Sequence, residues 1–276
     1  SRITNNSVTN ERGAGIFVAV DSTGVSAPVI QGCEVDSNYA FGGNNNISMG
    51  GGGIACTRLN AGPGVLVVTI SNCSVHGNSA PLNGGGMRFQ NVTAVVTHCR
   101  IRDNVVMPNS FSSNASGGGV SVSDSQFSIV NCEVVGNNAA SFGGGIFIAT
   151  LNAVTIQSCT IVGNSSMGPG GVYADNAPVT IAHSIIHGNS PIDAAFDSGA
   201  TLNLISSNIG SGVVVGGTSL SDDPRFVDPA AGDYHLSTTS PCANVGGSPS
   251  VPLPLTDLDG HPRWVGSLDM GADERP

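Results

Sequence analysis

The chain has 276 residues, with 39 glycines, 39% hydrophobic residues, only 10% charged residues and a formal net charge of −10. This acidic balance argues against a nucleic-acid partner or an anionic membrane surface, since both require basic proteins. No run of 18 apolar residues is present, so we expect no membrane insertion, and the apolar content is too high for a disordered chain.

The charge is unevenly distributed, and every basic residue is an arginine. Residues 1–192 carry 8 acidic and 6 basic side chains, whereas residues 193–276 carry 11 acidic and 3 basic ones. An acidic surface with few aromatic residues suits a secreted protein that must stay soluble. Because residues 1–4 already belong to a repeat, we expect that a leader was removed or that the chain is a piece of a longer protein.

A repeat of the form Ile-x-x-Cys-x-Val-x-x-Asn runs along most of the chain. Five full copies and one copy with serine for cysteine start at Ile30, Ile70, Val96, Ile129, Ile156 and Ile181. A looser copy, Ile3-Asn6-Val8-Asn10, precedes them, and a decayed copy, Leu204-Ser207-Ile209, follows them. The cysteine positions are 40, 26, 33 and 27 residues apart, which fits one coil of a three-sided solenoid plus its loops.

Glycines precede most repeats and predict a sharp corner before the first strand of each coil. The glycine groups are Gly13-Ala14-Gly15, Gly51–Gly53, Gly84–Gly86, Gly117–Gly119, Gly143–Gly145 and Gly170–Gly171. After the fifth group the expected strands are residues 143–148, 154–156 and 159–161, each with alternating apolar residues. Strands this short are stable only when coils stack in parallel and join their apolar sides.

Residues 1–212 therefore predict an all-β fold, a single-stranded right-handed parallel β-helix of about seven coils with three short strands per coil. Glycine triplets and β-branched triplets disfavour an all-α fold. A β-propeller is the nearest rival, but its blades need about 40 residues with four strands.

Five cysteines occupy the same inward position of the repeat, so we expect a column of thiols inside the core. They are Cys33, Cys73, Cys99, Cys132 and Cys159. We expect them to be reduced and to pack as small apolar side chains, and the absence of a C-x-x-C motif argues against a zinc site. The asparagine that closes each repeat is expected to hydrogen-bond its stacked neighbours.

The outward residues of the third strand carry most of the charge in the repeats. Stacking places Asp36 beside His76 and Arg100 beside Glu133 as cross-coil pairs. One interpretation is an anionic-sugar site at His76, Arg100 and Arg102; the other is a surface charge ladder that contributes little.

The outward residues of the first strand form a second column: Phe17, Ala55, Arg88, Ser121, Phe147 and Tyr173. Phe147 and Tyr173 are expected neighbours that either stack on sugar rings or pack as a cross-strand pair. Residues 39–50 and 105–116 are long insertions at one corner. They are either neutral or the walls of a cleft with Arg88 near its base.

The last part of the chain departs from the repeat and contains its own motifs. They are Asp222-Asp223-Pro224-Arg225-Phe226-Val227-Asp228, Gly232-Asp233-Tyr234-His235-Leu236, Ser240-Pro241-Cys242-Ala243, Asp257-Leu258-Asp259-Gly260-His261-Pro262-Arg263 and Asp269-Met270-Gly271-Ala272-Asp273-Glu274. This run resembles the C-terminal region of bacterial secreted right-handed β-helix proteins known as choice-of-anchor Q proteins. The resemblance implies export and a following cell-surface anchor, but no reaction. We expect residues 213–276 to form a segment that packs on the last coil and closes an open sheet edge.

No cofactor is expected. Asp257-x-Asp259-Gly260 offers acids of the kind that bind Ca²⁺ but lacks the spaced oxygen set of a calcium loop, so it predicts a turn. The β-helix class includes polysaccharide lyases and hydrolases. The chain has no lysine to act as a lyase base and no G-H-G motif of the polygalacturonase type, and no catalytic residues are assigned.

The sequence thus favours an exported or cell-surface protein of bacteria with a structural, adhesive or carbohydrate-binding role, whose partner is a polysaccharide or surface glycan. Head-to-tail self-association is an additional hypothesis, because the first coil begins without a visible cap. The alternative is a polysaccharide lyase or glycoside hydrolase that acts in a cleft on the side of the β-helix.

Overall fold

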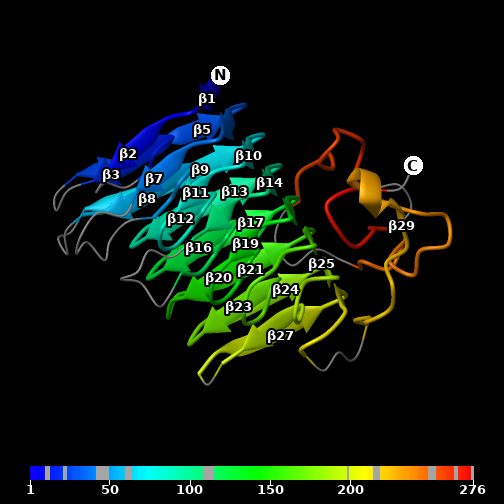
Figure 1. Cartoon of the computed structure of the whole chain (residues 1–276). Helices are drawn as coiled ribbons and strands as arrows, with labels where there is room; N and C mark the ends of the chain where they lie inside the picture. The colour runs from blue at the N-terminus through cyan, green and yellow to red at the C-terminus, as the bar shows by residue number, and fades with distance from the viewer. Residues whose placement is uncertain are drawn as a thin grey trace.

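Each sequence repeat folds into one coil, and successive coils stack in parallel along the solenoid shown in Figure 1. The computed structural model describes residues 1–9, 13–20, 24–41, 50–59, 64–107, 115–197, 199–213, 218–247, 253–263 and 267–274. The predicted parallel β-helix is confirmed. Within the described residues, no helix has the length and apolar character needed to cross a membrane.

Three sheets form the long sides of the solenoid, and we number them in the order in which the chain visits them within a coil. The first sheet contains β3 (Ile16–Val20), β8 (Ile54–Arg58), β12 (Met87–Gln90), β16 (Val120–Ser123), β20 (Ile146–Ala149), β23 (Val172–Asp175) and β26 (Ala194–Phe196). The second contains β4 (Val25–Ser26), β5 (Val29–Gln31), β9 (Val65–Ser71), β13 (Thr93–Thr97), β17 (Gln126–Val130), β21 (Val154–Gln157), β24 (Pro178–Ala182) and β27 (Thr201–Ile205). The third contains β1 (Arg2–Thr4), β6 (Glu34–Asp36), β10 (Ser74–His76), β14 (Arg100–Arg102), β18 (Glu133–Val135), β22 (Thr160–Val162), β25 (Ile185–His187) and β28 (Asn208–Ile209).

The structure adds a fourth, narrower sheet that the sequence did not predict. It contains β2 (Ser7–Thr9), β7 (Tyr39–Phe41), β11 (Ser79–Ala80), β15 (Val105–Val106) and β19 (Asn138–Ala139). These strands follow the repeat asparagine and have only two or three residues. A period-2 pattern cannot be recognised over so few positions, which is why three strands per coil were expected.

The glycine triplets allow neighbouring coils to approach closely at one corner. Gly51 has a φ of +78°, a left-handed backbone conformation that residues other than glycine rarely adopt. A Cβ atom on Gly53 would lie 2.6 Å from the carbonyl oxygen of Gly86 on the next coil. The triplet is therefore required by backbone packing.

One continuous apolar core fills the solenoid, and the predicted cysteine column lies within it. The backbone N–H of Cys33 donates to the Sγ of Cys73 at 3.5 Å, and that of Cys99 donates to the Sγ of Cys132 at 3.3 Å. All seven cysteines are free thiols. Burial raises the pKa of the Cys159 thiol to about 12, so this side chain behaves as a small apolar residue.

An asparagine ladder runs beside the core, as predicted. Each Nδ2 donates to the Oδ1 of the next member at 2.9–3.0 Å, in the order Asn6, Asn38, Asn78, Asn104, Asn137, Asn164 and Asn189. The series ends at Asp193, whose Oδ1 accepts from Asn189 Nδ2 at 2.9 Å. The buried members also donate to backbone carbonyls, so the ladder satisfies polar groups inside the corner.

The first repeat was placed out of register by sequence analysis. Ile3 was aligned with Ile30, but it pairs with Val35 in the third sheet. Asn6, and not Asn10, therefore occupies the ladder position. The mismatch arises because the described chain enters the solenoid at a third strand and lacks the two preceding strands of that coil.

The C-terminal segment lies along the side of the third sheet, where Figure 1 shows it in orange and red beside the coils. It contains β29 (Phe226–Asp228), the short 3-10 helix η1 (Pro229–Ala231) and β30 (Asp233–Leu236). It contacts the last coil, where Asn208 Nδ2 donates to the Asp222 carbonyl. It also extends to much earlier coils: the Ala272 N–H donates to Thr160 Oγ1 at 3.0 Å, and Arg100 binds Asp259. The segment thus covers a side of the solenoid in addition to the expected last coil, and the division of the chain at residue 212 stays a prediction.

The motifs of this segment form its internal framework. The fully buried Arg263 donates to the carbonyls of Gly271 at 2.7 Å and Ala272 at 2.9 Å. Asp257 Oδ1 accepts from the backbone N–H groups of Asp259 and His261, which forms the expected turn. Its Oδ2 accepts from the Glu274 N–H at 3.1 Å. These residues hold together a segment that has little regular secondary structure.

Candidate functional site

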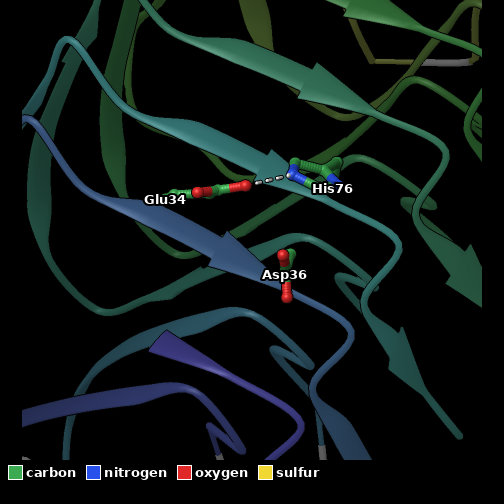
Figure 2. A group of neighbouring side chains, drawn as sticks. All are labelled: Glu34, Asp36 and His76. Atoms are coloured by element: carbon green, nitrogen blue, oxygen red, sulfur yellow. Dashed lines mark hydrogen bonds and ion pairs between the residues drawn. The ribbon is translucent and has the colours of Figure 1, made fainter. Parts of the chain in front are cut away.

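Two outward rows of charged residues lie on the third sheet, in the register that the repeat predicts. Strand pairing places His76 beside Asp36 and Arg100 beside Glu133. The Arg100 pair is an ion pair, with Nε 3.4 Å from Glu133 Oε2. His76 contacts a different acid: Figure 2 shows its ring directed at Glu34, with Nε2 3.4 Å from Oε1.

Side chains of the first coil already bind the carboxylate of Asp36. Its carboxylate accepts from Thr4 Oγ1 and from Arg2 Nη2, the latter at 2.6 Å. The hydrogen bonds from Thr4 and Arg2 lower the pKa of Asp36 below its ordinary value. Glu34, Asp36 and His76 thus form a charge ladder at one end of the sheet. The buried carboxylate of Asp36 is already paired with the guanidinium of Arg2.

A cavity of about 280 Å³ opens between the third sheet and the C-terminal segment. The solenoid contributes Arg100, Arg102 and Glu133, and the C-terminal segment contributes Asp233, Tyr234, His235, Asp259 and Asp273. Strands β14 and β18 fix the first three side chains, because parallel neighbours in the sheet cannot slip without turning every side chain over.

Both cavity arginines are already paired with acids. Arg102 Nη2 binds the buried carboxylate of Glu133, and Arg100 binds both Glu133 and Asp259. The structure therefore brings Arg100 and Arg102 together, but it does not leave them as free cations for a uronate. His76 lies on the adjacent strand β10 and does not line the cavity. The anionic-sugar site stays a prediction.

His235 is held between two carboxylates. Its Nδ1 lies 2.7 Å from Asp233 Oδ1, and its Nε2 lies 2.9 Å from Asp259 Oδ2. Burial alone would lower the pKa of His235, but Asp233, Asp273 and Asp259 together raise it above its ordinary value. The imidazole is thus the centre of an acidic cluster.

Asp273 is the most deeply buried acid of this cluster. It is 7% exposed, and within the described part of the chain its Oδ1 has no hydrogen-bond partner. Burial, followed by repulsion from Glu133 and Asp259, raises the pKa of Asp273 to about 7. Sequence analysis quoted His235 and Asp273 only as parts of family motifs, and it considered Asp259 as a possible calcium ligand but assigned its segment to a turn. The feature of the sequence that could have pointed to them is that each lies in a separate motif of the C-terminal segment.

A separate group of aromatic rings lies on and beside the first sheet. Phe147 and Tyr173 are cross-strand neighbours, as predicted, with ring centroids 5.9 Å apart and planes inclined by 16°. Phe142, which the sequence did not identify, stacks on Tyr173 with centroids 4.7 Å apart. Tyr173 Oη donates to Asp197 Oδ2 at 2.9 Å. Burial and the neighbouring Asp197 raise the pKa of Tyr173 to about 12.

Arg88 does not share a site with these rings. It lies on the predicted outward column, between Ala55 and Ser121, but all three side chains are buried and Arg88 is only 7% exposed. Its Nη2 donates to Gln90 Oε1 at 3.0 Å. The two insertions expected to form a cleft around Arg88 fall largely on residues 42–49 and 108–114, outside the described residues.

Comparison with known proteins identifies the repeats. The family described as the right-handed β-helix region matches residues 1–222. No curated protein matches the chain. Among solved structures, a crystal structure of pectate lyase Pel9A is similar: it is 15% identical, with a TM-score of 0.45, and the match covers 89% of this chain and 73% of the lyase chain.

Proposed function

Because the chain belongs to the right-handed β-helix family, we propose that it is an exported or cell-surface solenoid that binds carbohydrate chains and does not cleave them. The surface location is proposed from the motifs of the C-terminal segment, which resemble those of exported bacterial proteins. The binding role is proposed from one observation: the aromatic patch formed by Phe142, Phe147 and Tyr173.

The aromatic patch has the composition of a sugar-binding surface. Phe142 is 38% exposed and Phe147 and Tyr173 are half-buried, so apolar ring area is available at the surface. Aromatic rings pack against the apolar faces of sugars. The exposed carboxylate of Asp197, which orients the Tyr173 hydroxyl, adds acceptors for sugar hydroxyl groups.

Affinity electrophoresis through gels that contain neutral or acidic polysaccharides tests this proposal. Wild-type protein is expected to be retarded by at least one polysaccharide. Phe147→Ala and Tyr173→Ala are expected to weaken the interaction about 2- to 13-fold, in line with the loss of about 0.5–1.5 kcal/mol of stacking energy. Phe17→Ala is the matched control, because Phe17 is 45% exposed on the same sheet, several coils from the patch.

Two outcomes would contradict the proposal: no retardation by any polysaccharide, or equal weakening by Phe17→Ala. The same polysaccharides are also examined for new reducing ends and for the ultraviolet absorbance of unsaturated uronates. Product formation that is lost in Arg88→Ala or Arg102→Ala would instead support the alternative function, a polysaccharide lyase or hydrolase.

A further inference from the structure

We propose that His235, Asp259 and Asp273 form a binding site for a divalent transition-metal ion of the Zn²⁺ type, within the C-terminal segment. His235 lies on β30, Asp259 lies in the turn that follows Asp257, and Asp273 lies near the end of the described chain. One ligand atom from each of the three residues lies within 4.8 Å of the other two. This site is independent of the aromatic patch and of the proposed glycan binding.

Partners in the surrounding shell already orient two of the three ligands. Asp233 lies 2.7 Å from His235 Nδ1, which leaves Nε2 as the atom that faces the acids. A carboxylate behind the imidazole is the usual support of a metal-binding histidine, because it fixes the tautomer and the ring orientation. Arg100 similarly binds Asp259 Oδ1, so that the other oxygen, Oδ2, faces His235 Nε2 at 2.9 Å.

Asp273 supplies the observation that points to a cation. It is more than nine-tenths buried, it lines the cavity, and its Oδ1 has no hydrogen-bond partner among the described residues. A buried carboxylate oxygen without a partner is costly, and the nearby arginines do not relieve it because they bind Glu133 and Asp259. A metal ion between Asp273, Asp259 and His235 would provide the missing positive partner.

The donor set indicates which metal would bind. One imidazole nitrogen and two carboxylate oxygens suit Zn²⁺ or Co²⁺, whereas Ca²⁺ takes six to eight oxygen ligands. Zinc-to-ligand distances of about 2.0–2.2 Å place tetrahedral ligands roughly 3.4 Å apart. His235 Nε2 and Asp259 Oδ2, which are 2.9 Å apart, would therefore separate slightly, and the Asp273 oxygen, which lies within 4.8 Å of both, would approach them. Three protein ligands leave the fourth position open toward the 280 Å³ cavity, where water or a small ligand would complete the coordination.

The second group of acids and histidine does not meet the same criteria. Glu34, Asp36 and His76 also lie close enough to share an ion (Figure 2). In that group the buried carboxylate of Asp36 already accepts hydrogen bonds from Arg2 and Thr4. No side-chain oxygen of these described residues is both buried and unpartnered. The group therefore provides matched control positions.

The test is calorimetric titration of Zn²⁺ into the full, untagged chain, with Co²⁺ absorbance as a second readout. We expect one Zn²⁺ per chain, and intense visible bands from four-coordinate Co²⁺. His235→Gln and Asp273→Asn should abolish saturable binding, whereas His76→Gln should leave it unchanged. Asp233→Asn, which only removes the support behind the imidazole, should weaken binding about 10- to 100-fold.

Asp273→Asn keeps this test interpretable, because it removes a buried charge without changing the shape of the side chain and is expected to fold, as circular dichroism would show. The proposal is overturned if excess Zn²⁺ produces no saturable heat in the folded wild-type chain. It is also overturned if Ca²⁺ binds equally tightly at the same position, or if His76→Gln removes Zn²⁺ binding while Asp273→Asn retains it.

Discussion

The guanidinium of Arg100 is bonded to Asp259, a residue 159 positions later in the chain, while its Nε lies 3.4 Å from Glu133 on the adjacent strand. Arg100 thus joins a middle coil of the solenoid to the C-terminal segment. Among the described residues this is the ion pair that connects the solenoid to the segment, so its removal tests how firmly the segment is attached.

Replacing Arg100 by alanine is expected to loosen the C-terminal segment without unfolding the coils. The pair is partly exposed, so the loss of stability should be only about 0.5–1 kcal/mol. Limited proteolysis should cleave the C-terminal segment of Arg100→Ala faster than that of the wild type. Arg2→Ala is the control, because its acids, Glu34 and Asp36, both belong to the solenoid; equal acceleration in both variants would contradict the expected role.

The asparagine ladder predicts a large difference between two neighbouring residues. Asn137 is fully buried, donates to Asn164 and to the Ile101 carbonyl, and accepts from the backbone and side chain of Asn104. Asn137→Ala leaves these groups without partners and should cost about 3 kcal/mol or more in the free energy of unfolding.

Within the described residues, the side chain of the exposed Asn138 bonds that of Ser165, so Asn138→Ala should cost less than about 0.5 kcal/mol. Urea unfolding measures both variants. Similar midpoints would contradict a structural role for the ladder.

The cysteine column should accept serine more readily than valine. Ser184 and Ser207 already occupy later positions of the column, where their hydroxyls accept the backbone N–H groups of Cys159 and Ser184 at 3.1 and 3.2 Å. Cys132→Ser keeps an acceptor for the Cys99 N–H, whereas Cys132→Val leaves that buried group unpaired at a cost of about 1–3 kcal/mol. Urea unfolding should rank the serine variant as the more stable one, and the reverse order would refute the explanation.

The ionisation of Tyr173 offers a test of the aromatic patch. Burial and Asp197 raise the pKa of Tyr173 to about 12, because both disfavour the phenolate. A tyrosine whose pKa is raised in the folded state contributes stability that is lost as the pH rises above its ordinary value of about 10.

In a spectrophotometric titration of the three tyrosines, Tyr173→Phe should remove the step near pH 12. Asp197→Asn should move that step to lower pH, but only partly, since burial is the larger cause. An unchanged titration curve in Asp197→Asn would show that the hydrogen bond between these residues is absent in solution.

The sequence predicted the solenoid well because every coil repeats the same positions. Once Cys33 and Cys73 are aligned, the neighbours of each residue on the strands follow, and so the pairing of Phe147 with Tyr173 and of Arg100 with Glu133 was predicted correctly. The predicted register was wrong where the repeat is incomplete. The partial first coil was shifted, so that Asn10 was expected in place of Asn6.

The acidic cluster could not be predicted for a related reason. His235, Asp259 and Asp273 lie in non-repeating motifs separated by more than a dozen residues, and no periodicity relates their positions. The search for metal ligands considered cysteine spacing and calcium loops, and neither pattern includes one histidine and two distant aspartates. Sequence analysis placed Arg88 on an outward position near the base of a cleft, but its side chain is only 7% exposed, because an outward position on a strand does not by itself determine exposure.

The change from an amide to a carboxylate at Asp193 limits how many coils the asparagine ladder can connect. Each asparagine from Asn38 to Asn189 accepts a hydrogen bond from the preceding coil and donates one to the next ladder member, so the pattern can be repeated for a further coil. An ionised aspartate receives from Asn189 and Ser211 but has no N–H to pass on. Asp193 therefore ends the asparagine ladder, although β26, β27 and β28 still follow it in the stacked sheets. A coil duplicated upstream of Asp193 should extend the ladder, whereas a coil added after β28 would have no ladder asparagine to bond.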